Sequence, residues 1–306
     1  MIEVYKYGGN LLKYKENREK IYKFIKERIS KGNKLFIVVS ALGRKGDYFS
    51  TDNLSENTQL LSNSEKDRVM TFGEIYSSLI IKNELLKEDV KVTSVDYNEI
   101  GIICDNEYQN GNILSVDMSY LESLIKEFDV VIVPGFIGES MEGKIISLGR
   151  NTSDLTALLI GDYFNVNKVN IIKEVSGIYK QDIGNITSNK IINNISYDEV
   201  LSLIKAGSNI FSNKTIKFAK DKGIVIEVKG LDNEVGTIIS HKESEEEVLF
   251  VNKDNEEIKV VFKDMDVFNK IFKDLIDNKV KLDDLFIIKD IVYIKGNVND
   301  ILDKYL

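Results

Sequence analysis

Two nearby stretches, VVIVPGFIG at residues 130–138 and IISLGRNTSD at residues 145–154, decide the fold of this chain. The first begins with four apolar β-branched residues in a row, a pattern that predicts a buried strand. Pro134 is the only proline in the chain, and we expect it to end that strand. Gly135 has no side chain, so the backbone can come close to another group there. We therefore expect a ligand to lie beyond the end of this strand.

The second stretch predicts the start of a helix that runs to about residue 164. Ser153 or Asp154 can serve as its N-cap, and apolar residues follow at helical spacing. The N-terminus of a helix offers free N–H groups and a positive dipole end, which suit an anion. Arg150 could bind a carboxylate, and Asp154 could bind an ammonium group or a metal. Together they indicate a small zwitterionic ligand near a phosphate. The alternative is a capped helix with a surface arginine, and these residues alone leave both open.

The composition narrows the class of protein. The 306 residues can bury a sizeable core, and we expect one large domain plus a small one. The formal charge is −8 and the charges are interspersed, which argues against nucleic acid as a partner. One cysteine, Cys104, excludes an internal disulfide. One histidine, His241, argues against a His-based zinc site and a Ser-His-Asp triad, so we predict no protein-bound metal.

The N-terminus shows no pattern typical of a signal peptide. Met1 is followed almost at once by an expected core strand at residues 2–7. No apolar run approaches the ~20 residues needed to cross a bilayer. We therefore expect a soluble, cytoplasmic protein without a membrane partner.

Strands and helices alternate along most of the chain. We expect strands at residues 2–7, 35–39, 90–95, 130–133, 168–172, 224–228 and 237–240. We expect helices from the turn at residue 10 to about 29, at 65–86, 117–128 and 153–164, at 213–222, and one opening at Ser196 with a capping box to Glu199. This alternation predicts an α/β fold with a mostly parallel central sheet covered on both faces. Ligand sites should lie beyond the carboxyl ends of its strands.

The charged stretch at residues 241–247 is an expected linker. Beyond it we expect strands at 248–251 and 258–262, a helix at 267–278, strands at 285–288 and 291–295, and a helix at 299–305. That order predicts a small α+β module. We therefore predict two domains, residues 1–242 and residues 243–306.

Two glycine-containing motifs resemble phosphate-binding loops. In KYGG, from Lys6 to Gly9, a strand-to-helix turn can bring backbone amides and a lysine to a phosphate. The alternative is a tight turn with a solvated lysine. GESMEGK at residues 138–144 is close to the nucleotide loop G-x-x-x-x-G-K-[ST]. Because Ile145 follows and no helix does, we interpret it as the tip of a hairpin.

Two hydroxyl groups and a carboxylate complete the candidates. Ser40 ends a strand and Thr51 follows in the next loop, where each could meet a ligand; the alternative is ordinary loop residues. Gly73 in mid-helix costs about 1 kcal/mol against alanine, which a close approach of backbone would explain. Glu74 would then point into a cleft, the alternative being a solvated glutamate.

Taken in order, these motifs resemble those of the aspartate kinases, of the amino-acid kinase superfamily, over almost the whole chain. KYGG from residue 6 corresponds to K-F-G-G-T-S, VVSALGRKGD from residue 38 to V-V-S-A-M-G, and FGE from residue 72 to the G-E helix. PGFIG from residue 134 corresponds to P-G-F-x-G, LGRNTSD from residue 148 to L-G-R-G-G-S-D, and VSGIY from residue 175 to part of T-D-V-D-G-V-Y. ISYDE from residue 195 and GTII from residue 236 match I-S-Y-D-E and G-T-L-I. The C-terminal module resembles one ACT domain, an amino-acid-sensing unit of which most such kinases carry two.

The resemblance implies an amino-acid-kinase-like αβα sandwich and the phosphorylation of the L-aspartate side chain by ATP, with Mg²⁺ bound to the nucleotide. The product would be 4-phospho-L-aspartate, in the first step of the lysine, threonine and methionine branch. A homodimer and an amino-acid effector are also implied.

By matching position, the resemblance implies roles for individual residues. Lys6 and Asp154 would be catalytic. Arg150 would hold the α-carboxylate of the substrate and Glu74 its ammonium group. The full substrate-binding set is Ser40, Thr51, Glu74, Arg150 and Ser153. The full nucleotide-binding set is Lys6, Gly8, Gly9, Ser176, Gly177, Tyr179 and Asp182.

Several positions depart from the family pattern, mostly in the nucleotide half. These are Asn10 for the threonine of T-S, Asn151 and Thr152 for the two glycines after the arginine, and Lys173 and Glu174 for T-D. Asn209 replaces the lysine of G-A-K-V-L-H-P, which in the family meets the ATP phosphates. Losing that cation would cost several kcal/mol of transition-state stabilisation. Lys173 and Lys214 are candidates to replace it.

Three hypotheses about function follow. The first is an active aspartate kinase. The second is a catalytically impaired paralogue that acts as an amino-acid-binding or regulatory module, which the departures favour. The third is a kinase of the same superfamily that acts on another small acid.

Overall fold

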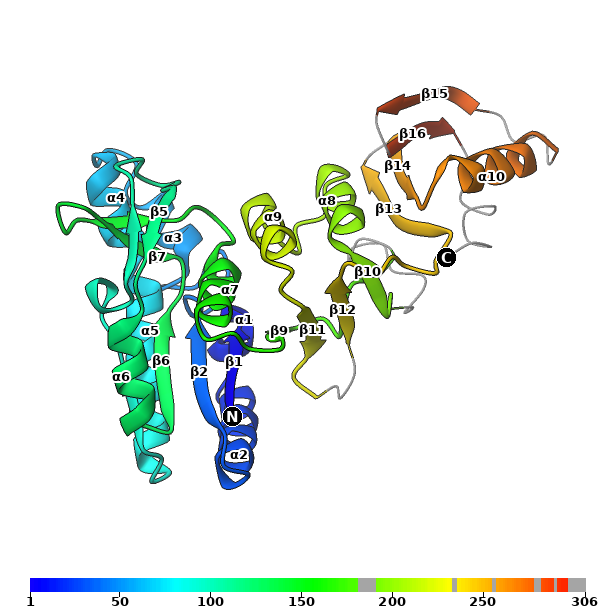
Figure 1. The fold of residues 1–306 in the computed structure, drawn as a ribbon. Helices are drawn as coiled ribbons and strands as arrows, with labels where there is room; N and C mark the ends of the chain where they lie inside the picture. The colour runs from blue at the N-terminus through cyan, green and yellow to red at the C-terminus, as the bar shows by residue number, and fades with distance from the viewer. Residues whose placement is uncertain (181–190, 233–235, 255–256, 278–281, 289–290, 297–306) are drawn as a thin grey trace. The chain divides into compact units, whose positions relative to one another are not determined.

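The structure is a computed structural model that describes residues 1–180, 191–232, 236–254, 257–277, 282–288 and 291–296 (Figure 1). The chain divides into two compact units. Unit 1 comprises Met1–Glu174 and Ile224–Asn233, and unit 2 comprises Val175–Gly223 and Glu234–Leu306. The predicted division at residue 242 stays a prediction. Among the described residues, no helix combines the length and the apolar character needed to span a bilayer.

Unit 1 is built on a parallel sheet with the strand order β11–β9–β1–β2–β6–β3. The strands are β1 (Ile2–Tyr7), β2 (Lys34–Val39), β3 (Val92–Ser94), β6 (Val130–Pro134), β9 (Val169–Lys173) and β11 (Ile226–Gly230). All five residues of β6 are buried, as four apolar β-branched residues predict for a central strand. The predicted α/β class with a mostly parallel sheet is confirmed.

Helices cover both faces of this sheet. The helices of unit 1 are α1 (Gly9–Lys13), α2 (Lys15–Ser30), α3 (Thr51–Glu56), α4 (Asn63–Met70), α5 (Phe72–Lys87), α6 (Ser119–Glu127) and α7 (Ser153–Tyr163), with a 3₁₀ turn η1 at Tyr97–Glu99. Tyr5 and Tyr7 of β1 pack with residues of α1, α2 and α5 in one buried cluster. Because alternate residues of a strand face opposite sides, Lys6 points to the other face, where its ammonium meets α7.

Two predicted helices are each divided in the structure. The helix expected after residue 10 breaks at Tyr14, whose backbone is extended. The helix expected at 65–86 breaks at Thr71, which ends α4 and precedes α5. The carboxylate of Asp67 in α4 accepts hydrogen bonds from the backbone N–H groups of Gln109 and Ser147, whereas α5 packs on β3 and β6. These separate attachments explain why one straight helix is not formed.

A smaller sheet of unit 1 has the strand order β5–β4–β7–β8. Its strands are β4 (Ile102–Cys104), β5 (Ile113–Val116), β7 (Ile137–Ser140) and β8 (Ile145–Ser147). β7 and β8 pair antiparallel across the turn that contains Gly143. The motif at residues 138–144 is therefore a hairpin, as predicted, and not a nucleotide loop.

Unit 2 combines a parallel pair of strands with an antiparallel sheet. Its elements are β10 (Asn194–Ser196), α8 (Tyr197–Lys205), α9 (Asn213–Lys222), β12 (Thr237–Ser240), β13 (Val248–Asp254), β14 (Glu257–Phe262), α10 (Met265–Asp277), β15 (Leu282–Ile288) and β16 (Ile291–Gly296). The antiparallel sheet has the order β13–β14–β16–β15, and Phe268 and Ile271 of α10 share its core (Figure 1). This arrangement is compatible with an ACT-like module. The helix expected at 299–305 lies outside the described residues.

Candidate active site

One buried carboxylate holds two lysines at the carboxyl ends of neighbouring strands. The ammonium of Lys6, near the end of β1, lies 2.7 Å from Oδ1 of Asp154. The ammonium of Lys173, the last residue of β9, lies 3.0 Å from Oδ2 of the same carboxylate. Asp154 is in the first turn of α7, where the helix dipole also favours a negative charge. The structure thus brings Lys6, Asp154 and Lys173 together, and the catalytic roles of Lys6 and Asp154 stay predictions.

The electrostatics of this cluster depend on burial and on the two lysines. Burial by itself raises the pKa of Asp154, but the charges of Lys173 and Lys6 outweigh it and hold the pKa below its usual range. Burial, together with repulsion from Lys6, lowers the pKa of Lys173, although Asp154 opposes the fall. With both lysines protonated, the three groups carry one excess positive charge. Such a cluster suits an anionic ligand.

The loop before α7 is shaped by two left-handed residues, Gly149 with φ of 104° and Asn151 with φ of 59°. Asparagine tolerates this conformation better than most residues, so Asn151 can stand where the family pattern has a glycine. The N-cap is Thr152, not Ser153 or Asp154 as predicted. The Thr152 hydroxyl donates to the carbonyl of Gly149 and does not cap, and Ser153 lies buried one residue inside the helix.

Gly135 allows the close approach that its sequence position indicates. A Cβ placed there would lie 2.7 Å from Cβ of Ser153, closer than two carbon atoms can pack. The end of β6 therefore reaches the first turn of α7 only because residue 135 has no side chain. This contact places Ser153 and Asp154 beyond the carboxyl end of the sheet, where ligands of parallel sheets bind.

Glu74 is a buried carboxylate in the first turn of α5. Thr51 donates a hydrogen bond of 3.4 Å to its Oε1, and among the described residues its Oε2 has no hydrogen-bond partner. Burial raises the pKa of Glu74 to about 8, although neighbouring hydrogen bonds and the charge of Lys6 oppose the rise. A buried carboxylate oxygen without a partner is costly unless it is protonated or meets a cationic ligand. An ammonium group would satisfy it.

The close approach expected at Gly73 is present. A Cβ there would lie 2.4 Å from the carbonyl oxygen of Phe49 and 2.5 Å from Cβ of Ala41. The glycine is not in mid-helix, however, but is the second residue of α5. Its lack of a side chain lets the loop after β2 lie against α5, next to Glu74.

Arg150 is exposed, and its guanidinium pairs with the carboxylate of Asp52 at 2.9 Å. Asp52 follows Thr51 in α3, and the Thr51 hydroxyl reaches Glu74. The first turn of α3 therefore connects the arginine to the buried glutamate. Arg150 and Glu74, which are expected to hold an α-amino acid, thus both contact this helix turn. Their substrate-binding roles stay predictions.

The KYGG turn packs tightly against its neighbours. The N–H of Gly8 donates to the carbonyl of Ile172 at 3.0 Å, so in this conformation the Gly8 amide is not available to a phosphate. A Cβ on Gly9 would lie 1.8 Å from the carbonyl oxygen of Ala41. The glycines therefore serve chain packing here. Ser40 follows β2, and its N–H donates to the carbonyl of Tyr7 at 3.3 Å.

The remaining predicted nucleotide residues belong to unit 2. Gly177 is buried, and a Cβ there would lie 2.5 Å from the side chain of Ile191. Tyr179 forms an antiparallel bridge with Ile191, and Ser176 lies just before this turn. Asp182 lies outside the described residues. The nucleotide roles of these residues stay predictions.

The sequence alone indicates Lys173 only as a candidate replacement for the lysine missing at Asn209, and Glu174 only as a departure from the family pattern. Lys173 binds Asp154, and Glu174 pairs with Arg44 of the loop after β2. The strand register indicates where Lys173 lies. Lys6 lies opposite Ile171, and Lys173, two residues further along β9, faces the same side of the sheet. Lys173 could thus have been placed on the face of Lys6.

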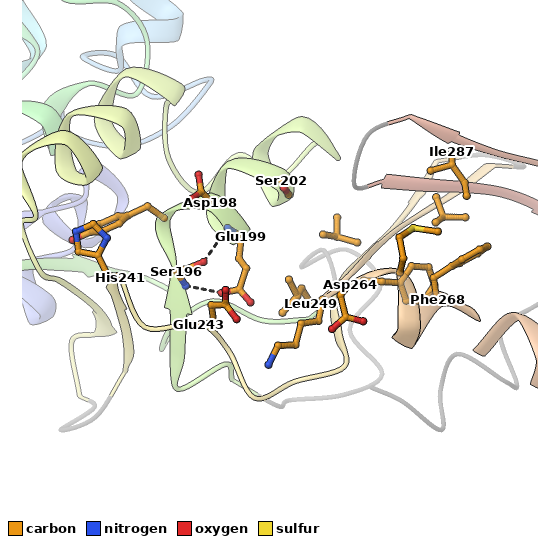
Figure 2. Close-up of a pocket in the computed structure, with 16 residues that line it drawn as sticks. Ser196, Asp198, Glu199, Ser202, His241, Glu243, Leu249, Asp264, Phe268 and Ile287 are labelled. Carbon is orange, nitrogen blue, oxygen red and sulfur yellow. Dashed lines mark hydrogen bonds between the residues drawn. The ribbon is translucent and has the colours of Figure 1, made fainter. Parts of the chain in front are cut away.

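Unit 2 contains a cavity of about 370 Å³ between α8 and the antiparallel module (Figure 2). Leu249, Phe268 and Val292 give it an apolar wall. At the other side Glu199 accepts from the Ser196 N–H in a capping box, as predicted from the sequence. Figure 2 shows the carboxylates of Glu199 and Glu243 on this side and Phe268 and Ile287 on the other. The cavity has room for a ligand of amino-acid size.

The family is identified by comparison with known proteins. The model of the amino acid kinase family matches residues 1–230, and this chain belongs to that family. It is 30% identical to the aspartokinase of Geobacillus stearothermophilus over 255 residues, which are 82% of this chain and 61% of that relative. The chain spans about three fifths of the length of the curated relatives that it matches.

Two solved structures of aspartokinase III from E. coli share the fold. The complex with aspartate and ADP has a TM-score of 0.68 and 18% identity, covering 97% of this chain and 78% of that chain. The complex with lysine and aspartate has a TM-score of 0.66 and 17% identity, covering 99% of this chain and 83% of that chain. At these identities the likeness is evidence for the fold alone.

Proposed function

We propose that this chain transfers the terminal phosphoryl group of ATP to the side-chain carboxylate of L-aspartate, giving 4-phospho-L-aspartate. The observation that carries the proposal is the buried cluster of Lys6, Asp154 and Lys173, with its excess positive charge at the edge of the sheet. Support comes from the similarity to aspartokinases and from the aspartate and ADP held by a protein of the same fold. The reaction would open the lysine, threonine and methionine branch, in the cytoplasm.

The proposed reaction asks for positioning and charge neutralisation. The attacking carboxylate is already an anion, so no general base is needed. Lys6 would stabilise the charge on the phosphoryl group, and Asp154 would hold Lys6 in place. Both oxygens of Asp154 are occupied by lysines, so a Mg²⁺ ion would be held by phosphate oxygens and water, as it prefers.

The amino-acid substrate would be held by opposite charges. Arg150 would leave Asp52 for the α-carboxylate, and the unpartnered oxygen of Glu74 would accept from the ammonium group. Ser40, Thr51 and Ser153 would line the same cleft. This pair of charges favours an α-amino acid over another small acid. Ser176, Gly177, Tyr179 and Asp182 would contact the nucleotide.

Trapping the product tests the proposal directly. Purified protein, MgATP, aspartate and hydroxylamine should give aspartyl hydroxamate, and aspartate should exceed glutamate and simple dicarboxylates in rate. No hydroxamate above a protein-free control would refute the kinase. The competing hypothesis, an amino-acid-binding module, predicts calorimetric binding of aspartate with none of MgATP.

We also propose that the cavity of unit 2 binds an amino-acid effector, and that the chain acts as a homodimer. The apolar wall and the carboxylate of Glu243 would suit a side chain with a cationic end. Thermal shift with each amino acid, on wild type and on Leu249→Trp, would test this. The variant fills the cavity and should abolish the shift; an equal shift in both proteins would place the effector elsewhere.

A further inference from the structure

Asp67 of α4 is a buried carboxylate to which the proposed reaction gives no role. None of its surface is exposed, and among the described residues no cation pairs with it. The carboxylate instead accepts from the N–H of Gln109 at 2.9 Å, and from the N–H and the hydroxyl of Ser147 at 2.9 Å and 2.8 Å. Burying a charge without an ion-pair partner costs free energy. What the chain gains is a fixed path for two distant backbone segments.

The first of these segments is the turn at Gln109, which is left-handed with φ of 68°. Asn63 of α4 accepts from the side-chain amide of Gln109 at 2.7 Å, so two residues on one face of α4 hold the turn. A Cβ placed on Gly149 would lie 2.9 Å from Oδ1 of Asn110, the next residue of the turn. The turn therefore packs directly on the loop that leads into α7.

The second segment is the end of β8, where Ser147 is the last residue of the strand. Besides its two bonds to the carboxylate, its carbonyl accepts from the N–H of Gly111 at 2.9 Å. Only Leu148 and Gly149 separate Ser147 from Arg150. A shift of Ser147 would therefore move the backbone of Arg150.

The main chain of Asp67 leads to the other charged group expected to hold the substrate. Its carbonyl accepts from the N–H of Thr71 at 3.1 Å, at the break between α4 and α5. Glu74 lies in the first turn of α5. Asp67 thus joins the backbone that carries Glu74 to the backbone that carries Arg150, and all of these residues belong to unit 1.

We infer that Asp67 is a positioning residue of the amino-acid site, which sets the separation of Glu74 from Arg150 and so favours aspartate over glutamate. The inference rests on the proposed function. The ammonium and carboxylate groups of an α-amino acid share one carbon, so the groups that hold them must keep a matching distance. Once both are held, the length of the side chain decides where its carboxylate meets the phosphoryl group. A misplacement of ~1 Å can cost ~100-fold in rate.

A purely structural role makes a different prediction. If Asp67 only stabilised the fold, its loss would lower the melting temperature and leave the choice of amino acid unchanged. If it positions Glu74 and Arg150, its loss weakens the binding of aspartate and brings aspartate and glutamate closer together as substrates, whereas nucleotide affinity is kept.

The experiment compares Asp67→Asn with a matched control. Asparagine keeps the shape, but its amide group faces N–H donors with a donor of its own. Calorimetry should show a loss of aspartate affinity of at least ~10-fold and a change for MgADP of less than about twofold. In the hydroxamate assay the ratio of kcat/KM for aspartate to that for glutamate should fall by ~10-fold. The control, Glu84→Gln, disturbs a carboxylate of α5 that bonds Arg18 and Tyr22 of α2, and should change none of the three.

A second variant covers the case in which Asp67→Asn does not fold. Ser147→Ala removes one donor to the carboxylate and keeps the N–H bond. It should shift aspartate affinity and the aspartate-to-glutamate ratio in the same direction by a smaller factor. Where both variants fold, the double variant should show less than the product of the two effects, because they act through one interaction.

The outcomes separate this inference from the proposed function. A lower melting temperature as the only effect of Ser147→Ala, and of Asp67→Asn where it folds, would overturn the inference even if wild type makes hydroxamate. Wild type that makes no hydroxamate but binds aspartate in an Asp67-dependent or Ser147-dependent way would refute the kinase and support the positioning role. Wild type that binds no aspartate would overturn both.

Discussion

The buried carboxyl group of Glu74 should make the stability of the protein fall as the pH rises. Its pKa is about 8 in the folded protein against 4.5 ordinarily, so the folded chain binds this proton more tightly than the unfolded chain does. The contribution is complete below about pH 4.5 and is lost as the pH rises through about 8. A difference of this size corresponds to about 5 kcal/mol in all, or about 1.4 kcal/mol for each pH unit in between.

Glu74→Gln removes the titrating proton and keeps the shape and a hydrogen-bonding oxygen. Urea unfolding of wild type and variant at several pH values from 5 to 9 measures the effect. We expect the free energy of unfolding of the wild type to fall relative to that of the variant by about 3–4 kcal/mol between pH 5 and pH 8. Glu122→Gln, at an exposed carboxylate of α6, serves as the control and should follow the wild type. Parallel curves for wild type and Glu74→Gln would refute the reasoning.

Three further perturbations test other parts of the site. Asp154→Asn leaves two ammonium groups together and should lower the free energy of unfolding by about 3–5 kcal/mol in urea. Lys173→Met in the same chain should recover part of that loss. Strictly additive effects of the two substitutions would contradict an interaction between Asp154 and Lys173. Arg150→Ala should raise the KM for aspartate far more than the KM for ATP in steady-state kinetics, whereas equal effects would contradict its assigned role. Gly73→Ala drives a methyl group into the carbonyl of Phe49 and should lower stability by about 1–3 kcal/mol in thermal unfolding, and a neutral result would argue against the close approach.

The parts of the fold that depend on local pattern could be predicted from the sequence. Four apolar β-branched residues from Val130 gave a fully buried strand, and the capping box at Ser196 is formed. The breaks at Tyr14 and Thr71 were not predicted, and across Thr71 the apolar periodicity continues from Val69 to Phe72 and Ile75. In the second case the division follows from the hydrogen bonds of Asp67 to a sheet far away in the sequence.

The sequence indicated which residues belong to the candidate site, but it did not indicate which residues they pair with. The motifs identified Lys6 and Asp154, and the structure joins them. The sequence could not show that Arg150 pairs with Asp52 or that the Gly8 amide donates to Ile172, because both partners come from distant segments. Such pairings depend on which strand ends meet, and that is a property of the topology.

A crystal structure with aspartate and MgADP tests the central claim most directly. The account predicts an oxygen of the nucleotide phosphates within about 3.2 Å of the ammonium of Lys6 or Lys173, and the ammonium of aspartate at the same distance from Oε2 of Glu74. Phosphates bound away from both lysines, with Glu74 still without a partner, would contradict it.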